Sequence, residues 1–367
     1  MIKTPELKYI NSITKLSSEK DEIRARYLIA SSDFKDGKVR LITEALGYGV
    51  GQIASKNDLK IYNCSNMVTD TMRKELVRII NQGQINNDWY FFDVALKYNI
   101  IDFKMVGFSG LLSLLAGDVF GNPYVKNGLI LNDIVLPNLA ESIFIGPKLG
   151  SNYILEKCDA SNSKFILGLL LKPDLGVDPE HYADLAEAAV QGGIHYIKED
   201  ELTLDSDLCR RLVRVEAISK KLGNFRDEIF YAANGTSPTY KIKDVCSQII
   251  NAGATAILIN GLQVGFDAIL HLASSEEISV PLHIHRAGYD IITSGLKAIN
   301  TSCLTKLFRL SGGDIIHVGS PLCGIFSIDE VVQNTKCLKS DLINLRPSLP
   351  VFSRSSDETI NFKWVFP

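Results

Sequence analysis

The sequence lacks paired cysteines, an excess of positive charge and long apolar runs. Its seven cysteines are scattered, with no CxxC pair and an odd count, which excludes a disulfide framework or a zinc site and indicates reduced thiols. The formal net charge of -3 offers no basic surface for nucleic acid. No apolar run approaches the roughly 20 residues of a membrane span, and residues 1–20 include no apolar signal region. We therefore expect a cytoplasmic protein with neither a nucleic-acid nor a membrane partner.

The chain is long enough for two domains, and its composition is that of a globular enzyme. It has 367 residues, of which 46% are hydrophobic and 22% charged. Residues 1–20 are predicted to be a lead-in and residues 21–140 an α+β domain, because strand and helix patterns are mixed there. The stretch from Thr69 to Asn81, for example, has helical spacing, whereas Trp89 to Tyr98 alternates as a strand does.

Residues 141–367 are predicted to form a second domain of repeated strand–helix units. From Phe165 onward, apolar strand patterns alternate with amphipathic helix patterns seven times. The strands are predicted at 165–171, 193–198, 229–233, 256–259, 282–285, 315–318 and 349–352. Such a series predicts an α/β fold, either a parallel barrel or a doubly wound sheet. An eight-stranded barrel lacks a clear last strand, for which the only candidate is Ile360 to Val365.

One strand of this series ends in a lysine and carboxylates. Lys198 and Asp200 are two residues apart and share a strand face, and Glu201 follows where the strand ends. In a parallel barrel the carboxyl ends of the strands carry the chemistry. Two carboxylates beside a lysine that can be desolvated or modified would suit a hard cation such as Mg²⁺. A charged loop after a buried strand is the alternative interpretation of this stretch alone.

Polar side chains also end the other predicted strands, and together they suggest enolate chemistry. They are Lys172, Asn234, Asn260, His283, His285, Arg286, His317 and Ser353. A metal held by the carboxylates can stabilise an enolate, and a desolvated Lys172 can act as acid or base because burial lowers a lysine pKa. Arg286 suits a phosphate or carboxylate, with His317 and Ser353 as further donors. His283 and His285 share a strand face, so both are predicted to point inward, with His285 nearer the rim. The alternative is that only one of them faces the cavity and the other hydrogen-bonds to the backbone.

Several ordered motifs resemble the RuBisCO large subunit over about Glu22 to Ser353. They are Phe144–Gly150, Gly168–Gly176, Gly192–Glu201, Leu282–Ala287 and Gly313–His317, together with Asp118 in Gly117–Gly121. The resemblance implies a C-terminal (β/α) TIM-type barrel preceded by a ferredoxin-like α+β domain. It further implies a homodimer with shared active sites, in which Asp118 enters the site of the second subunit.

The resemblance also implies roles for the residues at the strand ends. Lys198 would be carbamylated by CO₂ and would bind one Mg²⁺ together with Asp200 and Glu201. Lys172 would be the enolisation acid or base, and His285 a catalytic contact. The substrate, or its phosphate, would be bound by Arg286, His317, Ser353 and Asn234.

Departures from the carboxylase pattern point to a RuBisCO-like protein (form IV). Carboxylases carry a lysine at Asp174, an asparagine at Asp118 and a lysine in the loop corresponding to 318–324, where this chain has none. Carboxylation of a bisphosphate is therefore not expected. The predicted function is enolisation of a small keto-sugar acid or its monophosphate by an isomerase, a tautomerase or a β-keto acid decarboxylase. A non-catalytic homologue that serves as a binding or regulatory protein is the alternative.

Overall fold

The computed structural model describes residues 5, 10, 13–48, 76–122, 125–158, 166–223, 225, 228–320, 327–339 and 345–352. The chain divides into two compact units, one of Met1–Ile143 with Asp290–Leu304 and one of Phe144–Tyr289 with Thr305–Pro367. Each unit is built on one β-sheet. Ser353 and the candidate eighth strand at 360–365 lie outside the described residues.

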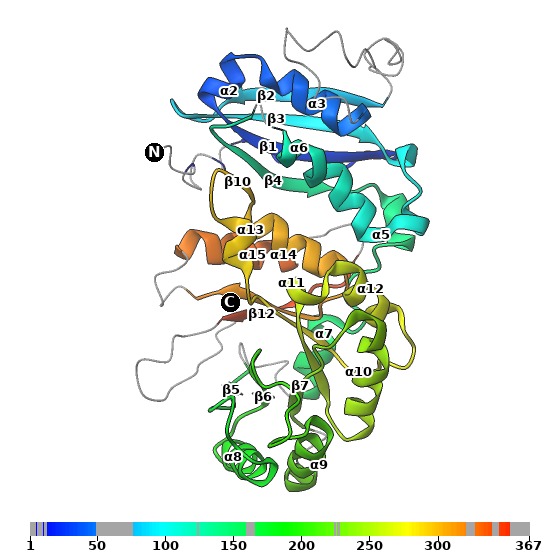
Figure 1. Cartoon of the computed structure of the whole chain (residues 1–367), viewed down its shortest axis with the longest axis vertical. Coiled ribbons are helices and arrows are strands. Elements are labelled where there is room, and N and C mark those ends of the chain that lie inside the picture. Colours follow the sequence, from blue (N-terminus) through cyan, green and yellow to red (C-terminus); the bar gives the residue numbers. More distant parts are fainter. Residues whose placement is uncertain are drawn as a thin grey trace. The chain divides into compact units, whose positions relative to one another are not determined.

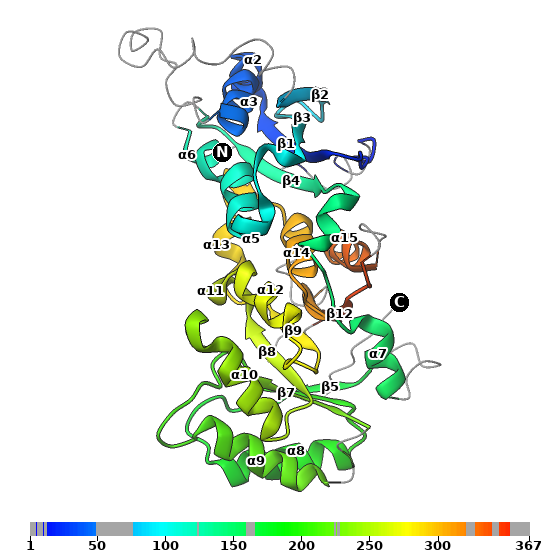
Figure 2. The same ribbon diagram turned by 90° about the vertical axis from the view of Figure 1, so that its right-hand side faces the viewer.

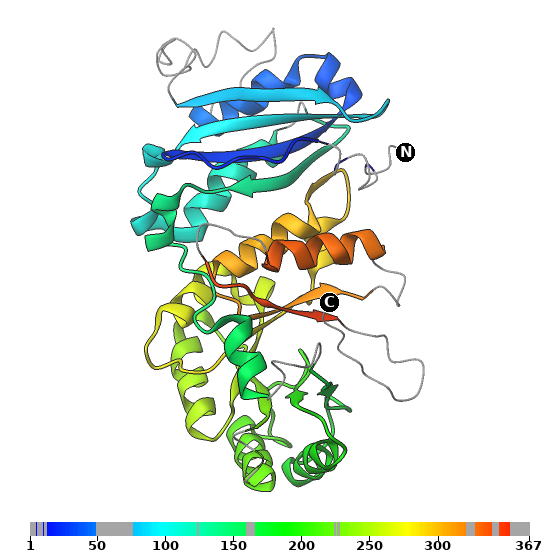
Figure 3. The ribbon, with the colours of Figure 1, turned by 180° about the vertical axis from the view of Figure 1, so that it is seen from behind.

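The sheet of the first unit has the strand order β10-β4-β1-β3-β2. Strand β1 lies between β3 and β4 and is antiparallel to both, as Figure 3 shows for the dark-blue strand. This order, with helices in the β1–β2 and β3–β4 connections, is the ferredoxin-like arrangement, so the expected domain type is confirmed. The strands are β1 (Glu22–Ala30), β2 (Val77–Gln84), β3 (Trp89–Lys97), β4 (Leu129–Val135) and β10 (Lys297–Ile299).

The described α-helices in the β1–β2 and β3–β4 connections lie on one side of the sheet (Figure 2). They are α2 (Ser31–Lys35), α3 (Lys38–Tyr48), α5 (Phe103–Leu112) and α6 (Asp118–Gly121). Contrary to expectation, Phe103–Gly121 is long and apolar enough to cross a membrane by length and composition, a test that core helices of soluble proteins also pass. The Tyr27 hydroxyl of β1 donates to the Leu115 carbonyl over 2.7 Å, and Phe108 and Leu111 are fully buried. These contacts hold part of the stretch against its unit, although only 33% of it is buried.

Three strands of this sheet, β2, β4 and β10, were not predicted from the sequence. Residues 77–81, which were expected at the end of a helix, belong to β2 and pair with β3. Strand β10 lies about 160 residues after β4 and pairs with it in parallel. Strands β2 and β10 are largely exposed or short, so they owe their conformation to a partner strand more than to a local pattern. Strand β4 is mostly buried, and the sequence analysis missed it although Leu129–Leu131 is a local apolar run.

The sheet of the second unit is parallel, and its seven strands follow one another in chain order (Figure 1). The strands are β5 (Gly168–Leu170), β6 (Tyr196–Lys198), β7 (Phe230–Asn234), β8 (Ala256–Asn260), β9 (Leu282–His285), β11 (Ile315–Gly319) and β12 (Leu349–Phe352). The helices between them include α8 (Pro179–Gln191), α9 (Arg211–Leu222), α10 (Ile242–Asn251), α11 (Gly261–Val264), α12 (Phe266–Ser274), α14 (Thr301–Leu310) and α15 (Ile328–Lys339). The curled sheet is a seven-stranded half-barrel within the described residues, which confirms the TIM-type α/β fold.

The predicted helix starts in this unit have the expected hydrogen bonds. Asp178 caps α8 by accepting from the His181 amide, and Pro179 follows it. Ser327 and Glu330 exchange reciprocal hydrogen bonds at the start of α15, which is a capping box.

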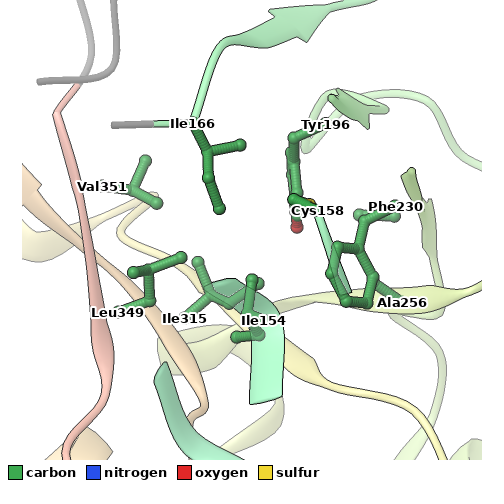
Figure 4. Close-up of a cluster of buried hydrophobic side chains, with 10 residues drawn as sticks. Ile154, Cys158, Ile166, Tyr196, Phe230, Ala256, Ile315, Leu349 and Val351 are labelled. Atoms are coloured by element: carbon green, nitrogen blue, oxygen red, sulfur yellow. The ribbon is translucent and has the colours of Figure 1, made fainter. Parts of the chain in front are cut away.

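The apolar core of the half-barrel lies at the amino ends of its strands (Figure 4). Tyr196, Phe230, Ala256, Ile315 and Leu349 begin five of the strands and are buried together with side chains of α7 (Gly150–Lys157). Because side chains alternate along a strand, the residue two positions further along each strand lies on this same inner face. The carboxyl ends of the strands are thereby left for polar side chains.

Candidate active site

Strand alternation separates the consecutive charged residues at the end of β6. Lys198 lies two residues after the core residue Tyr196 and Asp200 two residues further, so both share the inner face. Glu199 points the opposite way, where Arg214 of α9 and Tyr231 of β7 donate to its carboxylate. Lys198 and Asp200 lie on one face, as the sequence predicts. Glu199, which the sequence analysis did not single out, ties the end of β6 to α9.

Lys198 is a buried amine. Its side chain has 2% of its surface exposed, and its Nζ donates to the Glu199 carbonyl over 3.1 Å. Burial lowers the pKa of Lys198 to about 8, although the negative charges of Asp200 and Glu201 act to raise it. The amine is therefore partly neutral near physiological pH, which is the state that reacts with CO₂.

The pKa values of the neighbouring carboxyl groups of Asp200 and Glu201 shift in opposite directions. Burial and the neighbouring Asp200 raise the pKa of Glu201. Burial alone would also raise the pKa of Asp200. Hydrogen bonding to Glu201 and the positive charge of Lys198 outweigh burial and lower the pKa of Asp200 to about 2. Two adjacent carboxyl groups with opposite shifts are typical of a pair that repels when both are ionised.

Two asparagine amides hold the turn that carries these carboxylates. Asn234 Nδ2 donates to the Asp200 carbonyl over 2.9 Å and to the Glu201 carbonyl over 3.3 Å. Asn260 Nδ2 donates to the Glu201 carbonyl over 3.1 Å. These contacts favour a positioning role for Asn234, whereas its contact with substrate stays a prediction. Asn260 ends its strand as Asn234 does, and this was the sequence signal for it.

Lys172 differs from the desolvated base that its sequence suggested. Its Nζ lies 2.5 Å from Asp174 Oδ2 and 3.1 Å from Asp200 Oδ2, and 48% of its side chain is exposed. Burial works against its charge, but these two carboxylates raise the pKa of Lys172 above its usual value. The expectation of a pKa near neutrality is therefore wrong, because Asp174 stands beside the amine.

Three histidine rings gather on the inner face of β9 and β11. The ring centroid of His317 lies 4.8 Å from that of His283 and 4.7 Å from that of His285. Burial lowers the pKa of all three histidines well below the usual value. His283 Nδ1 lies 2.6 Å from the Tyr196 hydroxyl. Both β9 histidines therefore share the face predicted for them, and His285 lies within 3.4 Å of Glu201.

The hydrogen bonds of His285 define its tautomer. Its Nδ1 accepts from the Ala287 amide over 3.2 Å, so the proton of the neutral ring is on Nε2. That Nε2 lies 3.4 Å from Glu201 Oε2. His285 therefore directs an N–H group toward the carboxylate pair.

The structure brings together most of the predicted site residues but not all. Arg286 follows β9 directly and is half-buried, within the same unit as Lys172, Lys198, Asp200, Glu201, Asn234, His285 and His317. Asp118 belongs to the other unit, where it is exposed at the start of α6. Ser353 lies outside the described residues. The roles of Arg286, Asp118 and Ser353 stay predictions.

The donors at the end of β6 fit a hard cation once Lys198 is modified. No group of three His, Cys, Asp or Glu side chains in the described part of the chain is arranged to hold a metal. The predicted ligands supply two carboxylates, from Asp200 and Glu201, and one amine. A carbamate on Lys198 would convert that amine into an oxygen ligand and complete a set that suits Mg²⁺. A divalent cation would also relieve the repulsion within the carboxylate pair.

Comparisons with known proteins agree with this arrangement. A RuBisCO-like protein of Archaeoglobus fulgidus is 29% identical over 300 residues, which cover 77% of this chain and 67% of that protein. A 2,3-diketo-5-methylthiopentyl-1-phosphate enolase of Geobacillus kaustophilus is 28% identical over 67% of this chain and 62% of its own length. The chain thus spans about two thirds of the length of these relatives.

A solved structure has the same fold. The RuBisCO-like protein MtnW of Alicyclobacillus acidocaldarius superposes with a TM-score of 0.76 and 20% identity over 92% of this chain and 82% of that one. The family model for the catalytic domain of the ribulose bisphosphate carboxylase large chain matches residues 152–353, more than half of the sequence. The chain therefore belongs to the RuBisCO large-chain family.

Proposed function

We propose that this protein is a Mg²⁺-dependent enzyme that enolises a small keto-sugar acid or its monophosphate, as an isomerase, a tautomerase or a β-keto acid decarboxylase. The observation that carries this proposal is the buried Lys198 beside Asp200 and Glu201. The pKa of Lys198 is about 8, so the amine is available to CO₂. When bound by these residues, Mg²⁺ supplies the positive charge that polarises a substrate carbonyl and stabilises an enolate.

The other residues of the site have complementary parts in this proposal. His285 orients Glu201 through its Nε2–H group. Lys172 is held protonated by Asp174 and Asp200, so it serves as a proton donor to the enolate, not as the base. Arg286, His317 and Ser353 are proposed to bind the phosphate end of the substrate, because a guanidinium fork matches phosphate oxygens.

Relatives of this chain carry the names of both carboxylases and enolases, so the preference for enolisation rests on the site residues as well as on the names. Two Geobacillus relatives are named 2,3-diketo-5-methylthiopentyl-1-phosphate enolases. Asp174 is an acidic residue where carboxylases carry a lysine. This difference agrees with a reaction other than carboxylation. A non-catalytic homologue is less favoured, because the lysine and both carboxylates are present and the asparagine amides of β7 and β8 hold them in position.

We also propose a homodimer with shared active sites and a cytoplasmic location. The dimer rests on the resemblance of Gly117–Gly121 to a motif that lies in the partner's site within the family. The location rests on the composition. Both are expectations for experiment.

Enolisation can be measured without knowing the natural substrate. With Mg²⁺ and bicarbonate in D₂O, the protein should accelerate deuterium exchange at the carbons next to the keto group of dihydroxyacetone phosphate, as followed by proton NMR. Lys198→Ala should abolish the acceleration, whereas Lys243→Ala, which removes an exposed lysine of α10, should retain it. Exchange no faster than in buffer, or equal exchange by Lys198→Ala, would contradict the proposal.

A further inference from the structure

Asp174 has one carboxylate oxygen that is paired and one that is not. Its Oδ2 lies 2.5 Å from Lys172 Nζ, and the same amine lies 3.1 Å from Asp200 Oδ2. Asp174 Oδ1 is buried and accepts no hydrogen bond from any group in the described part of the chain. Through Lys172, Asp174 is therefore linked to Asp200, one of the two carboxylates proposed to hold Mg²⁺.

The loop that carries Asp174 is fixed in place. The Tyr182 hydroxyl of α8 donates to the Pro173 carbonyl over 2.5 Å, and the Tyr182 side chain is 1% exposed. The Lys172 ion pair anchors the other oxygen of Asp174. The buried Oδ1 is therefore held in position and, without a donor, it destabilises the fold.

A second acceptor of the same kind lies on the Glu201 side of the site. Asn260 Nδ2 donates to the Glu201 carbonyl, which defines the orientation of the amide because a carbonyl cannot face the amide oxygen. Asn260 Oδ1 is then a buried acceptor, also without a partner among the described residues. Asp174 and Asn260 thus offer acceptors at the ends of β5 and β8, and acceptors require donors such as hydroxyl groups.

The charge around Asp174 argues against an anion at this end. Asp174 adds a carboxyl group beyond the two that are proposed to hold Mg²⁺, and its partner Lys172 also pairs with Asp200. A substrate carboxylate or phosphate placed here would meet like charges, whereas a hydroxyl would satisfy Oδ1. Sites built to accept a hydrogen bond from a substrate hydroxyl discriminate strongly against analogues that lack it.

We propose that Asp174 is a specificity-determining residue: it accepts a hydrogen bond from a hydroxyl of the substrate next to the enolised centre and rejects a carboxylate or phosphate there. This inference rests on the proposed function and narrows its substrate class. The substrate is a hydroxylated keto-sugar monophosphate whose only anionic group lies at the end away from Asp174.

Three phosphate compounds test the inference on the whole protein with Mg²⁺ and bicarbonate present. Dihydroxyacetone phosphate has a hydroxymethyl group next to its keto group, acetol phosphate has a methyl group in that place, and 3-phosphohydroxypyruvate has a carboxylate in that place. Calorimetry should show that the parent binds the first at least about tenfold more tightly than either of the others. Equal affinities of the parent for dihydroxyacetone phosphate and acetol phosphate would overturn the inference without reference to any variant.

Variants then assign the discrimination to one side chain. Asp174→Asn removes the charge and keeps the shape, so it should bind 3-phosphohydroxypyruvate more tightly than the parent does. Its affinities for 3-phosphohydroxypyruvate and for dihydroxyacetone phosphate should lie within about threefold of each other. Asp184→Asn, at an exposed carboxylate of α8 that pairs with Lys221, is the matched control and should keep the parental ratio. An unchanged ratio in a folded Asp174→Asn would overturn the inference.

Failure of the proposed function would give a different binding result from failure of the inference about Asp174. A parent that binds Mg²⁺ but none of the three phosphates would remove the substrate class and this inference with it. A parent that binds all three without discrimination would remove only the role of Asp174.

Discussion

Arg214 and Glu199 form a fully buried ion pair, in which Arg214 Nε lies 2.7 Å from Glu199 Oε1 and Nη2 lies 3.1 Å from Oε2. Tyr231 adds a hydrogen bond of 2.6 Å to the same carboxylate. Since neighbouring residues on a strand face opposite ways, this anchor on the helix side directs Lys198 and Asp200 to the inner face. The stability of the unit and the geometry of its site therefore depend on one carboxylate.

Replacing Glu199 by Gln should destabilise the protein strongly. The variant keeps the shape of the side chain but leaves the Arg214 guanidinium buried without a counter-charge, which costs about 3–5 kcal/mol. Urea unfolding of parent and variant measures the loss. Glu277→Gln removes an exposed partner of Lys243 and should change stability little. A Glu199→Gln loss no larger than that of this control would show that the buried pair is not the anchor.

The low pKa of Lys198 should make stability depend on pH in a particular direction. The folded chain has a Lys198 pKa of about 8, against an ordinary value of 10.5. Between these values the unfolded chain binds more protons, so this group makes the free energy of unfolding increase with pH, by up to about 3 kcal/mol. Below about pH 8 the full cost of burying the charged amine is present.

Comparison with Lys198→Met isolates this contribution from other titrating groups. Unfolding free energies of both proteins at several pH values, without metal or bicarbonate, give the difference. The parent should gain stability relative to Lys198→Met as the pH rises from about 8 to about 10.5. Parallel curves would mean that Lys198 has an ordinary pKa.

The fold was largely predictable because its signals are local. The apolar runs Leu282–His285 and Leu349–Phe352 have the bounds of β9 and β12, and Ser327 with Glu330 marks the start of α15. Strand β10 was not predictable, because three residues carry little pattern and their conformation depends on pairing with β4.

The placement of the β6 residues of the site was also predictable from the local sequence, whereas the ionisation of its side chains was not. Alternation along one strand correctly placed Lys198 and Asp200 on one face. The ionisation of Lys172 was predicted wrongly, because it depends on Asp174 and Asp200, which meet the amine only in the folded loop. Asn234 was predicted only to bind the substrate. Its hydrogen bonds to the turn of Asp200 and Glu201 were not predicted, because they depend on contacts between strands.

Arg286→Ala should weaken a phosphorylated ligand selectively. Losing one partner of a desolvated charge pair costs about 2–4 kcal/mol, so the affinity for dihydroxyacetone phosphate should fall by that amount. Dihydroxyacetone without phosphate is the matched ligand and should be far less affected. Equal losses for both ligands, measured by calorimetry, would assign Arg286 a structural role.

Mixing two inactive variants tests the shared site. If Asp118 of one subunit completes the site of the other, combining Asp118→Ala with Lys172→Ala should restore up to about a quarter of parental activity through mixed dimers. Combining Asp200→Ala with Lys172→Ala is the control, because both residues belong to the same unit of one subunit, and it should restore none. Full activity in a monomer, or no recovery in the first mixture, would remove the shared site.

The most direct test of the central claim is whether Lys198 carries a carbamate that binds Mg²⁺. With ¹³C-bicarbonate and Mg²⁺, carbon NMR of the parent and of Lys243→Ala should show one carbamate signal, and calorimetry should show CO₂-dependent Mg²⁺ binding. Lys198→Ala should lose both, and Lys198→Glu should recover some Mg²⁺ binding without CO₂ because it supplies a carboxylate. Mg²⁺ binding by Lys198→Ala that equals that of the parent would contradict the account.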